Sequence, residues 1–340
     1  MINILTSELC KKLMPNKKIV IITGGAGFIG SHAVDKFLEN NYKVRVIDNL
    51  VGGSEKNLSH LKNNKDLSLE IKDIRNIDLD SSFFKDVDYL IHFAGIGDIV
   101  PSIENPLEYM SVNVLGTVNM LECSRNANIK NFVYAASSSC YGIAETPTKI
   151  TSQIKPQYPY ALSKYQGEQA CFHWNKVYKL PVNIIRIFNA YGTRSKTSGA
   201  YGAVFGVFLK QKLSGKPFTV VGDGTQKRDF LYVTDVVNAF FEASITDRDG
   251  QIYNLGAGKP QTINYLVKLL EGNVTYIPSR PGEPKTTWAN ISKIVNELKW
   301  KPKVSFEVGV MKIIKNINYW KDAPVWTPEM IEIATKKWFE

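Results

Sequence analysis

The sequence predicts an α/β fold: a doubly wound parallel sheet followed by a smaller C-terminal α/β region. Short apolar runs rich in Val and Ile recur along the first half of the chain, separated by segments of helical character. Such runs are typical of strands buried on both faces. A glycine-rich turn lies directly between the first run and the first helical segment. Strands that alternate with helices in this way build a parallel sheet covered by helices.

The elements follow from these runs in chain order. Strands are expected at residues 19–23, 43–47, 67–71, 89–94, 131–136 and 182–188, and helices at residues 31–40, 108–126 and 159–178. Beyond residue 188 the alternation becomes irregular. We therefore expect one domain at residues 19–188 and a second region at residues 189–340, some of whose strands and helices return to the first. Residues 1–18 are expected to form a helical extension, ended by Pro15, and residues 326–339 an amphipathic helix.

Composition argues against several other classes of protein. The 340-residue chain has a formal net charge of +10, but its lysines are scattered, so we expect no nucleic-acid partner. No apolar run reaches the roughly 18 residues that a membrane span needs, and the N-terminus lacks the apolar stretch of a signal peptide. The four cysteines lie far apart, without metal-ligand spacing, and fit a reducing compartment. We expect a soluble cytoplasmic protein without a metal ion or a membrane partner.

The glycine-rich turn predicts a dinucleotide site. Gly24, Gly27 and Gly30 follow the first strand and open a helix, which lets the backbone approach a pyrophosphate at the helix N-terminus. Asp48 ends the second strand, 18 residues beyond Gly30, where a carboxylate accepts both hydroxyls of an adenosine ribose. That position favours NAD over NADP. The alternative is that Asp48 caps a turn with Asn49.

Three other strand ends carry polar residues. Asp73 and Ile74 follow the third strand and are expected beside the adenine. His92 lies inside the fourth apolar run, where a hydrogen-bonded core histidine is expected rather than a catalyst. Ser137 to Ser139 end the fifth strand, and ligands of such sheets sit at the carboxyl ends of the strands. The serines are expected in that crevice; the alternative is a hydroxyl-rich loop that satisfies its own backbone.

Tyr160 and Lys164 predict the chemistry. They lie four residues apart in a helical segment and therefore share one face of the helix. A phenol has an unperturbed pKa of about 10 and is a poor base at neutral pH unless a nearby charge favours the phenolate. Lys164 and a positively charged oxidised nicotinamide would both favour it, which indicates the base of a hydride-transfer site. The alternative is a chance pair on a surface helix.

In combination the motifs resemble those of one family. They are Thr23-Gly24-Gly25-Ala26-Gly27-Phe28-Ile29-Gly30, Asp48-Asn49-Leu50, His92-Phe93-Ala94-Gly95, Ser137 to Gly142, Tyr160 to Lys164 and Arg228-Asp229-Phe230. From Ile19 to about Trp320 the chain resembles the extended short-chain dehydrogenase/reductase family of nucleotide-sugar epimerases and dehydratases, and within it most of all the UDP-N-acetylglucosamine (UDP-glucose) 4-epimerases. The resemblance implies a Rossmann-like domain that binds NAD and a C-terminal region that binds the nucleotide sugar.

The resemblance also implies roles for individual residues. NAD would contact Gly24, Gly27, Phe28, Ile29, Gly30, Asp48, Asn49, Asp73, Ile74, Phe93, Ala94, Gly95, Asn113, Tyr160 and Lys164. Catalysis would use Tyr160, Lys164, Ser137 and Ser138. The UDP-sugar would contact Ser138, Ser139, Asn189, Val204, Arg228, Arg280, Glu283 and Thr287. In these roles the two arginines match cations for the diphosphate, and Glu283 matches an acid that holds the ribose of the nucleotide.

Departures from the family pattern favour a 4-epimerase. Ser138 and Ser139 stand where dehydratases carry an Asp-Glu pair, and the loop lacks the Glu that is usual in decarboxylases. Tyr160 would then remove the proton of the 4-hydroxyl, with Lys164 lowering the phenol pKa and holding the nicotinamide ribose. Ser137 would hydrogen-bond O4, with Ser138 as the second candidate.

The prediction of which sugar is bound rests on two single positions. Thr287 replaces a bulky tyrosine before Trp288 and leaves room for an N-acetyl group, which favours UDP-GlcNAc/UDP-GalNAc alongside UDP-Glc/UDP-Gal. Asp98 would oppose an anionic sugar unless it points away. A UDP-uronic acid 4-epimerase, a decarboxylase and a 4-keto reductase are the alternatives among enzymes; a non-catalytic NAD-binding module is the alternative from another class. The resemblance further implies a homodimer through the helices at 108–126 and 159–178, which could equally pack on the sheet.

Overall fold

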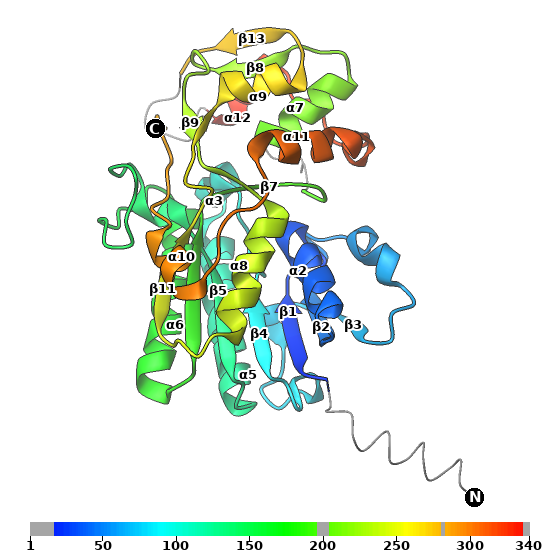
Figure 1. The fold of residues 1–340 in the computed structure, drawn as a ribbon, viewed down its shortest axis with the longest axis vertical. Helices are drawn as coiled ribbons and strands as arrows, with labels where there is room; N and C mark the ends of the chain where they lie inside the picture. Colours follow the sequence, from blue (N-terminus) through cyan, green and yellow to red (C-terminus); the bar gives the residue numbers. More distant parts are fainter. Residues whose placement is uncertain (1–16, 196–203, 280–282, 336–340) are drawn as a thin grey trace, which may run out of the picture.

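A seven-stranded parallel sheet forms the centre of the larger domain in the computed structural model, which describes residues 17–195, 204–279 and 283–335 (Figure 1). Its strand order is β11-β6-β5-β4-β1-β2-β3. The strands are β1 (Ile19–Thr23), β2 (Lys43–Asp48), β3 (Leu67–Ile71), β4 (Tyr89–His92), β5 (Asn131–Ser137), β6 (Val182–Ile187) and β11 (Gln251–Leu255). The six expected strands are present, β4 ends two residues early, and β11 joins the edge from the C-terminal half.

Burial on both faces explains why the strands are continuous apolar runs. In β1, Val20 and Ile22 face one core and Ile21 faces the other, and all three are fully buried. All the pairings in this sheet are parallel, so the carboxyl ends of its strands lie at one edge. The doubly wound architecture predicted from the sequence is confirmed.

Helices cover the two faces of the sheet. One face carries α2 (Phe28–Glu39), α8 (Val233–Ile245) and α10 (Ser292–Leu298), and the other carries α3 (Ile99–Glu104), α4 (Pro106–Met110), α5 (Gly116–Asn126) and α6 (Pro159–Tyr178). The single helix expected at 108–126 is instead composite, because a π turn at Ser111–Leu115 separates α4 from α5. Helix α6 has the expected bounds, with Pro159 in its first turn, where a missing N–H costs nothing.

Short 3₁₀ segments complete the loops of the sheet domain and one turn of the C-terminal region. They are η1 (Glu55–Leu61), η2 (Ile74–Asn76), η3 (Ser82–Phe84), η5 (Ser138–Tyr141) and η6 (Ile317–Trp320). No helix among the described residues is both long and apolar enough to cross a bilayer. Residues 1–16, which make up most of the expected helical extension, lie outside the described residues.

The C-terminal region has a core of its own, at the top of Figure 1. It contains three two-stranded sheets: β7 (Asn189–Tyr191) with β10 (Phe230–Tyr232), β9 (Lys227–Arg228) with β12 (Gln261–Thr262), and β8 (Phe218–Val221) with β13 (Val274–Ile277). Its helices are α7 (Val204–Leu213), α9 (Ile263–Leu270), α11 (Phe306–Lys315) and α12 (Pro328–Thr335). Aromatic rings of Tyr191, Phe205, Phe230 and Phe306 pack together at its centre.

Candidate active site

A cavity of about 890 Å³ lies where the carboxyl ends of β1, β2, β4, β5 and β6 meet the C-terminal region. Every residue that the sequence assigned to the site lines this cavity, except Asn113 and Arg280. Arg280 lies outside the described residues. The topology therefore collects side chains from positions 24 to 287 around one space.

The glycine turn forms a close backbone cradle at one end of the cavity. Gly24 has φ +68°, and a Cβ placed on it would lie 2.7 Å from the backbone nitrogen of Ala94. A Cβ on Gly30 would lie 2.1 Å from the carbonyl oxygen of Gly24. Helix α2 begins beside this turn at Phe28, and no side chain caps it. The first N–H groups of α2 are thus available to an anionic group, as a dinucleotide requires.

Asp48 lies at the same end and is held by the backbone. Its Oδ2 accepts the N–H of Ala26 at 2.9 Å and its Oδ1 accepts the N–H of Leu50 at 2.8 Å, so the turn-capping alternative is also realised. Burial raises the pKa of this carboxyl, while the two backbone bonds oppose the shift. A Cβ on Gly53 would lie 2.9 Å from both carboxylate oxygens, so only glycine fits there. The remaining lone pairs of Asp48 can serve ribose hydroxyls.

Asp73 is oriented by a residue that sequence reasoning missed. The Nε of Arg75 donates to Oδ1 of Asp73 at 3.0 Å and its Nη2 donates to Oδ2 at 2.8 Å. These bonds lower the pKa of Asp73 to about 2. Arg75 also reaches Glu108 at 3.1 Å, and both line the cavity. The only feature of the sequence that could have indicated this contact is an Asp followed two residues later by an Arg, just after a strand.

Asn113 occupies a different place from the one expected. It is 1% exposed in the π turn, and its amide both donates to and accepts from the backbone of Ile96, at 3.0 and 2.9 Å. It donates to the Ser163 Oγ as well, at 2.9 Å. Asn113 therefore fixes the loop after β4 from behind the cavity wall instead of lining it.

Tyr160 and Lys164 lie on the cavity-facing side of α6. Tyr160 stacks in parallel on Tyr158, with ring centroids 6.3 Å apart, and its phenol faces Gly97, where a Cβ would lie 4.0 Å from the oxygen. Lys164 is 7% exposed, and its Nζ lies 4.4 Å from the ring centroid of Tyr134. Burial lowers the pKa of Lys164 to about 8.

The protonation state of Tyr160 differs from the expectation. Burial raises the pKa of the phenol above its usual 10, the Asp98 charge acts in the same direction, and the hydrogen bond with Ser137 opposes both. The chain alone thus favours the neutral phenol, and Lys164 is not among the groups that lower its pKa. The physical reason is that a buried anion loses its hydration.

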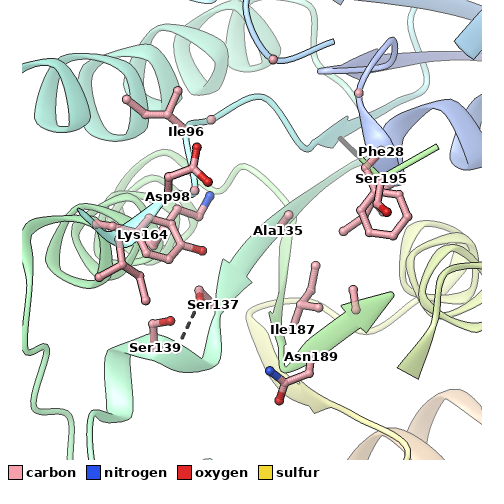
Figure 2. A pocket seen from close by; sticks show the side chains of 18 of the residues that line it. Phe28, Ile96, Asp98, Ala135, Ser137, Ser139, Lys164, Ile187, Asn189 and Ser195 are labelled. Carbon is pink, nitrogen blue, oxygen red and sulfur yellow. Dashed lines mark hydrogen bonds between the residues drawn. The ribbon is translucent and has the colours of Figure 1, made fainter. Parts of the chain in front are cut away.

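Ser137 is the serine that interacts with the phenol. It ends β5, and its Oγ accepts the N–H of Ser139 at 3.2 Å (Figure 2). Ser138 and Ser139 form the first turn of η5 and line the cavity beside it. The hydroxyl-rich loop therefore satisfies part of its own backbone and also faces the cavity.

The opposite wall comes from the C-terminal region. Arg228 forms a short ion pair with Glu283, so the two residues act as one unit and not as separate contacts. The Thr287 Oγ1 donates to Oδ1 of Asn189 at 2.6 Å and accepts the N–H of Asp229 at 3.2 Å. The small Thr287 side chain is thus fixed in orientation beside Asn189. Val204 opens α7 on the same wall.

A buried ion pair connects the catalytic helix to the serine loop, and the sequence analysis missed it. Arg186 donates to both carboxylate oxygens of Glu168, at 2.8 and 2.6 Å, and to the Tyr141 hydroxyl at 2.6 Å. That hydroxyl donates to Asn254 at 2.7 Å. Glu168 lies one turn beyond Lys164 on the same face of α6. A lone arginine inside the apolar run of β6 was the available signal.

His92 has the structural role that the sequence predicted. Its Nδ1 lies 2.7 Å from the Oγ1 of Thr23 and its Nε2 lies 3.0 Å from the Oγ1 of Thr117. The ring is fully buried, which lowers its pKa to about 3, so it stays neutral and ties β4 to β1 and α5.

A family model and a similar protein sequence indicate the same family for this chain. A sequence model of the NAD dependent epimerase/dehydratase family matches residues 20–256. A putative UDP-glucose 4-epimerase of Methanocaldococcus jannaschii is 37% identical over 312 residues, which cover 88% of this chain and 99% of that protein.

Two solved structures share the fold over about nine-tenths of the chain. A UDP-N-acetylglucosamine 4-epimerase of Methanobrevibacter ruminantium, in complex with UDP-N-acetylmuramic acid, superimposes with a TM-score of 0.83 at 32% identity, covering 89% of this chain and 100% of the other. A UDP-glucuronic acid 4-epimerase of Bacillus cereus, in complex with UDP-glucuronic acid and NAD, gives a TM-score of 0.82 at 31% identity, covering 89% and 99%.

Proposed function

The chain belongs to the NAD-dependent epimerase/dehydratase family, and we propose that it epimerises UDP-GlcNAc and UDP-GalNAc at C4, alongside UDP-Glc and UDP-Gal. It is an enzyme that uses NAD, and its activity is 4-epimerisation of a UDP-sugar. The observation that carries the proposal is the cavity itself, because Ser137, Tyr160 and Lys164 share it with the glycine cradle and Asp48.

The residues present fit NAD. The cradle of Gly24 and Gly30 leaves space that any Cβ would fill, which suits a pyrophosphate against the N-terminus of α2. Asp48 would hold the adenosine ribose, and Asp73, fixed by Arg75, would lie near the adenine. Lys164 would hold the nicotinamide ribose. When bound, NAD supplies the chemistry of accepting a hydride from C4 of the sugar and returning it.

The chain's own residues would move the proton. Tyr160 takes the proton of the 4-hydroxyl as C4 becomes a ketone, and it returns that proton to O4 when the alcohol forms again. Ser137 donates a hydrogen bond to O4, since its Oγ lies at the phenol. Lys164, protonated in the main at pH 7, supplies positive charge on the same helix face. The 4-keto sugar turns about its diphosphate after the first hydride transfer. The returning hydride therefore reaches the other face of C4.

Preference for an N-acetyl sugar rests on Thr287. Its hydroxyl is bonded to Asn189 and Asp229, so the side chain cannot turn to fill more of the cavity. A tyrosine at this position would occupy that space. Thr287→Tyr is expected to reduce kcat/KM for UDP-GlcNAc more than tenfold while changing that for UDP-Glc less, and an equal loss on both sugars would contradict the argument.

The test of the function follows the anomeric protons of UDP-GlcNAc by NMR in the presence of the NAD-loaded protein. We expect UDP-GalNAc to appear and to reach the same ratio from either direction. Tyr160→Phe should retain nucleotide binding and lose conversion, because it removes only the hydroxyl. Conversion of UDP-Glc without UDP-GlcNAc would refute the N-acetyl preference, and a fully active Tyr160→Phe enzyme would refute the assigned base.

A UDP-uronic acid is the alternative substrate against which the proposal is tested, because a UDP-glucuronate 4-epimerase of Thermodesulfobacterium geofontis is 30% identical over 92% of this chain. The same base and the same cofactor would serve it. The difference lies in the substituent at C5, and the same NMR assay with UDP-glucuronate tests it.

We also propose a homodimer through α5 and α6. Leu107 and Leu115, on α4 and the π turn, are 80% and 63% exposed, and Leu162 and Val177 on α6 are exposed as well. The opposite faces of α5 and α6 pack on the sheet, so a contact between two copies would not disturb that packing. Exposed apolar groups of this kind suit a self-complementary contact between two copies. Light scattering should give about twice the chain mass, and the double variant Leu107→Lys/Leu115→Lys should give a monomer.

A further inference from the structure

We propose that Asp98 selects the sugar by charge, so that the site accepts uncharged UDP-hexoses and rejects UDP-uronic acids. The inference rests on the proposed function, because it names the class of sugar that the same site takes.

Asp98 lies in the loop between β4 and α3, on the cavity wall that also carries Lys164 and the serines (Figure 2). Its carbonyl oxygen accepts the hydroxyl proton of Tyr109 at 2.7 Å, which fixes the backbone at this point. Although it precedes α3, its side chain does not cap that helix.

The charge of Asp98 acts on the reacting end of the cavity. It contributes to the raised pKa of the Tyr160 phenol, and the ring of Tyr109, bonded to the Asp98 carbonyl, packs edge-on against Tyr160 at 6.4 Å between centroids. The sugar must place O4 on the Tyr160 hydroxyl for proton transfer. In a uronic acid the carboxylate is on C5, next to C4. A uronate bound productively would thus place its negative charge near that of Asp98.

The described cations of the cavity each have another partner. Arg75 is bonded to Asp73 and Glu108, Arg228 to Glu283, and Lys72 to Asp78. Lys164 lies over the Tyr134 ring and is needed beside the phenol. Among the described lining residues, a uronate carboxylate would meet Asp98 without gaining a free cation. Like charges brought close together inside a protein cavity oppose binding by about tenfold or more.

The experiment compares UDP-glucuronate with UDP-glucose on the NAD-loaded full-length protein. We expect the ratio of their kcat/KM values to be below about 0.1 for the wild type. Asp98→Asn, which keeps the shape and removes the charge, should raise that ratio at least about tenfold, and Asp98→Ser should act in the same direction. Asp98→Glu keeps the charge and should keep the ratio low. Asp80→Asn removes one exposed carboxylate outside the cavity and should leave the ratio unchanged.

Calorimetric affinities for the two nucleotide sugars, measured on the same variants, separate this inference from the proposed function. A binding preference for UDP-glucose that Asp98→Asn removes supports the inference even where neither sugar is converted, a result that would refute the proposed function alone. Equal affinities in the wild type, or a ratio that Asp98→Asn leaves unchanged in both assays, would overturn the inference even in an active 4-epimerase.

Discussion

Lys164 is expected to cost the folded protein stability, and replacing it by methionine measures that cost. The pKa of this ammonium falls from 10.5 to about 8 because it is buried. Methionine has a similar length, carries no charge and suits irregular apolar space. The Lys164→Met protein should therefore be more stable than the wild type at pH 7, although it should lack epimerase activity.

The magnitude follows from linkage between folding and proton binding. The difference between 10.5 and about 8, at about 1.4 kcal/mol per pH unit, amounts to about 3 kcal/mol. Below pH 8 both states carry the proton, so the folded state bears the whole cost. Between pH 8 and 10.5 the unfolded chain binds more protons, so the stability of the wild type rises with pH. Loss of the cation–π contact with Tyr134 offsets about 1–2 kcal/mol of the gain, which leaves about 1–2 kcal/mol at pH 7.

Urea denaturation of the NAD-free proteins at pH 7 and pH 10 tests this. The gain of Lys164→Met should be clear at pH 7 and should shrink at pH 10, where the folded wild type has released the proton. Lys176→Met, an exposed position on the same helix, is the matched control and should change the free energy of unfolding by less than about 0.5 kcal/mol at either pH. A Lys164→Met protein that is less stable than the wild type at pH 7 would refute the reasoning.

Three other predictions concern the cradle, the buried pair and Asp73. Gly30→Ala should weaken NAD binding more than tenfold in a calorimetric titration, since its Cβ would lie 2.1 Å from a backbone oxygen; unchanged affinity would show that the turn can shift. Arg186→Met should lower the free energy of unfolding by about 3–5 kcal/mol, and the double variant with Glu168→Met should recover part of it; no recovery would argue against an unpaired buried charge as the cause. The Asp73 pKa of about 2 stabilises the fold above the unfolded value of 3.8 and is lost as the pH falls towards 2. Asp73→Asn should therefore be less stable than the wild type at pH 6 and equal to it near pH 2 in urea denaturation, and a constant difference would contradict this.

The sheet was predictable because its signal is local. The strands β1, β4, β5 and β6 are almost entirely buried and read as short apolar runs, and residues at the strand ends must meet at one edge whatever the loops do. That is why Gly24, Asp48 and Ser137 could be placed in one crevice from the sequence. In contrast, β11 pairs with β6 across more than sixty residues. A return of some C-terminal elements to the sheet was expected, but no local pattern identified β11 as one of them.

The parts of the site that could not be predicted depend on tertiary contacts. Asn113 follows a helical pattern, yet the π turn moves its amide behind the wall to hold Ile96. Arg75 pairs with Glu108 and Arg186 pairs with Glu168, and each acid lies in another segment of the chain, so no local pattern identifies either pair. How deeply Tyr160 is buried, and hence the direction of its pKa shift, is set by every element around it. Sequence reasoning named Tyr160 as the candidate base, but the direction of its pKa shift follows only from the fold.

That resting state explains how burial can serve the reaction. A phenol with a raised pKa holds its proton, and a lysine with a pKa of about 8 holds its charge only narrowly, so the chain alone is not poised to abstract a proton at neutral pH. Because both groups are buried, each added charge acts strongly on their pKa values. A positive charge entering beside Tyr160 lowers its pKa, whereas the negative charge of Asp98 opposes that change. Removing Asp98 should therefore alter sugar selection and also move the pH dependence of turnover to lower pH, two effects of one carboxylate that a purely steric role would not produce together.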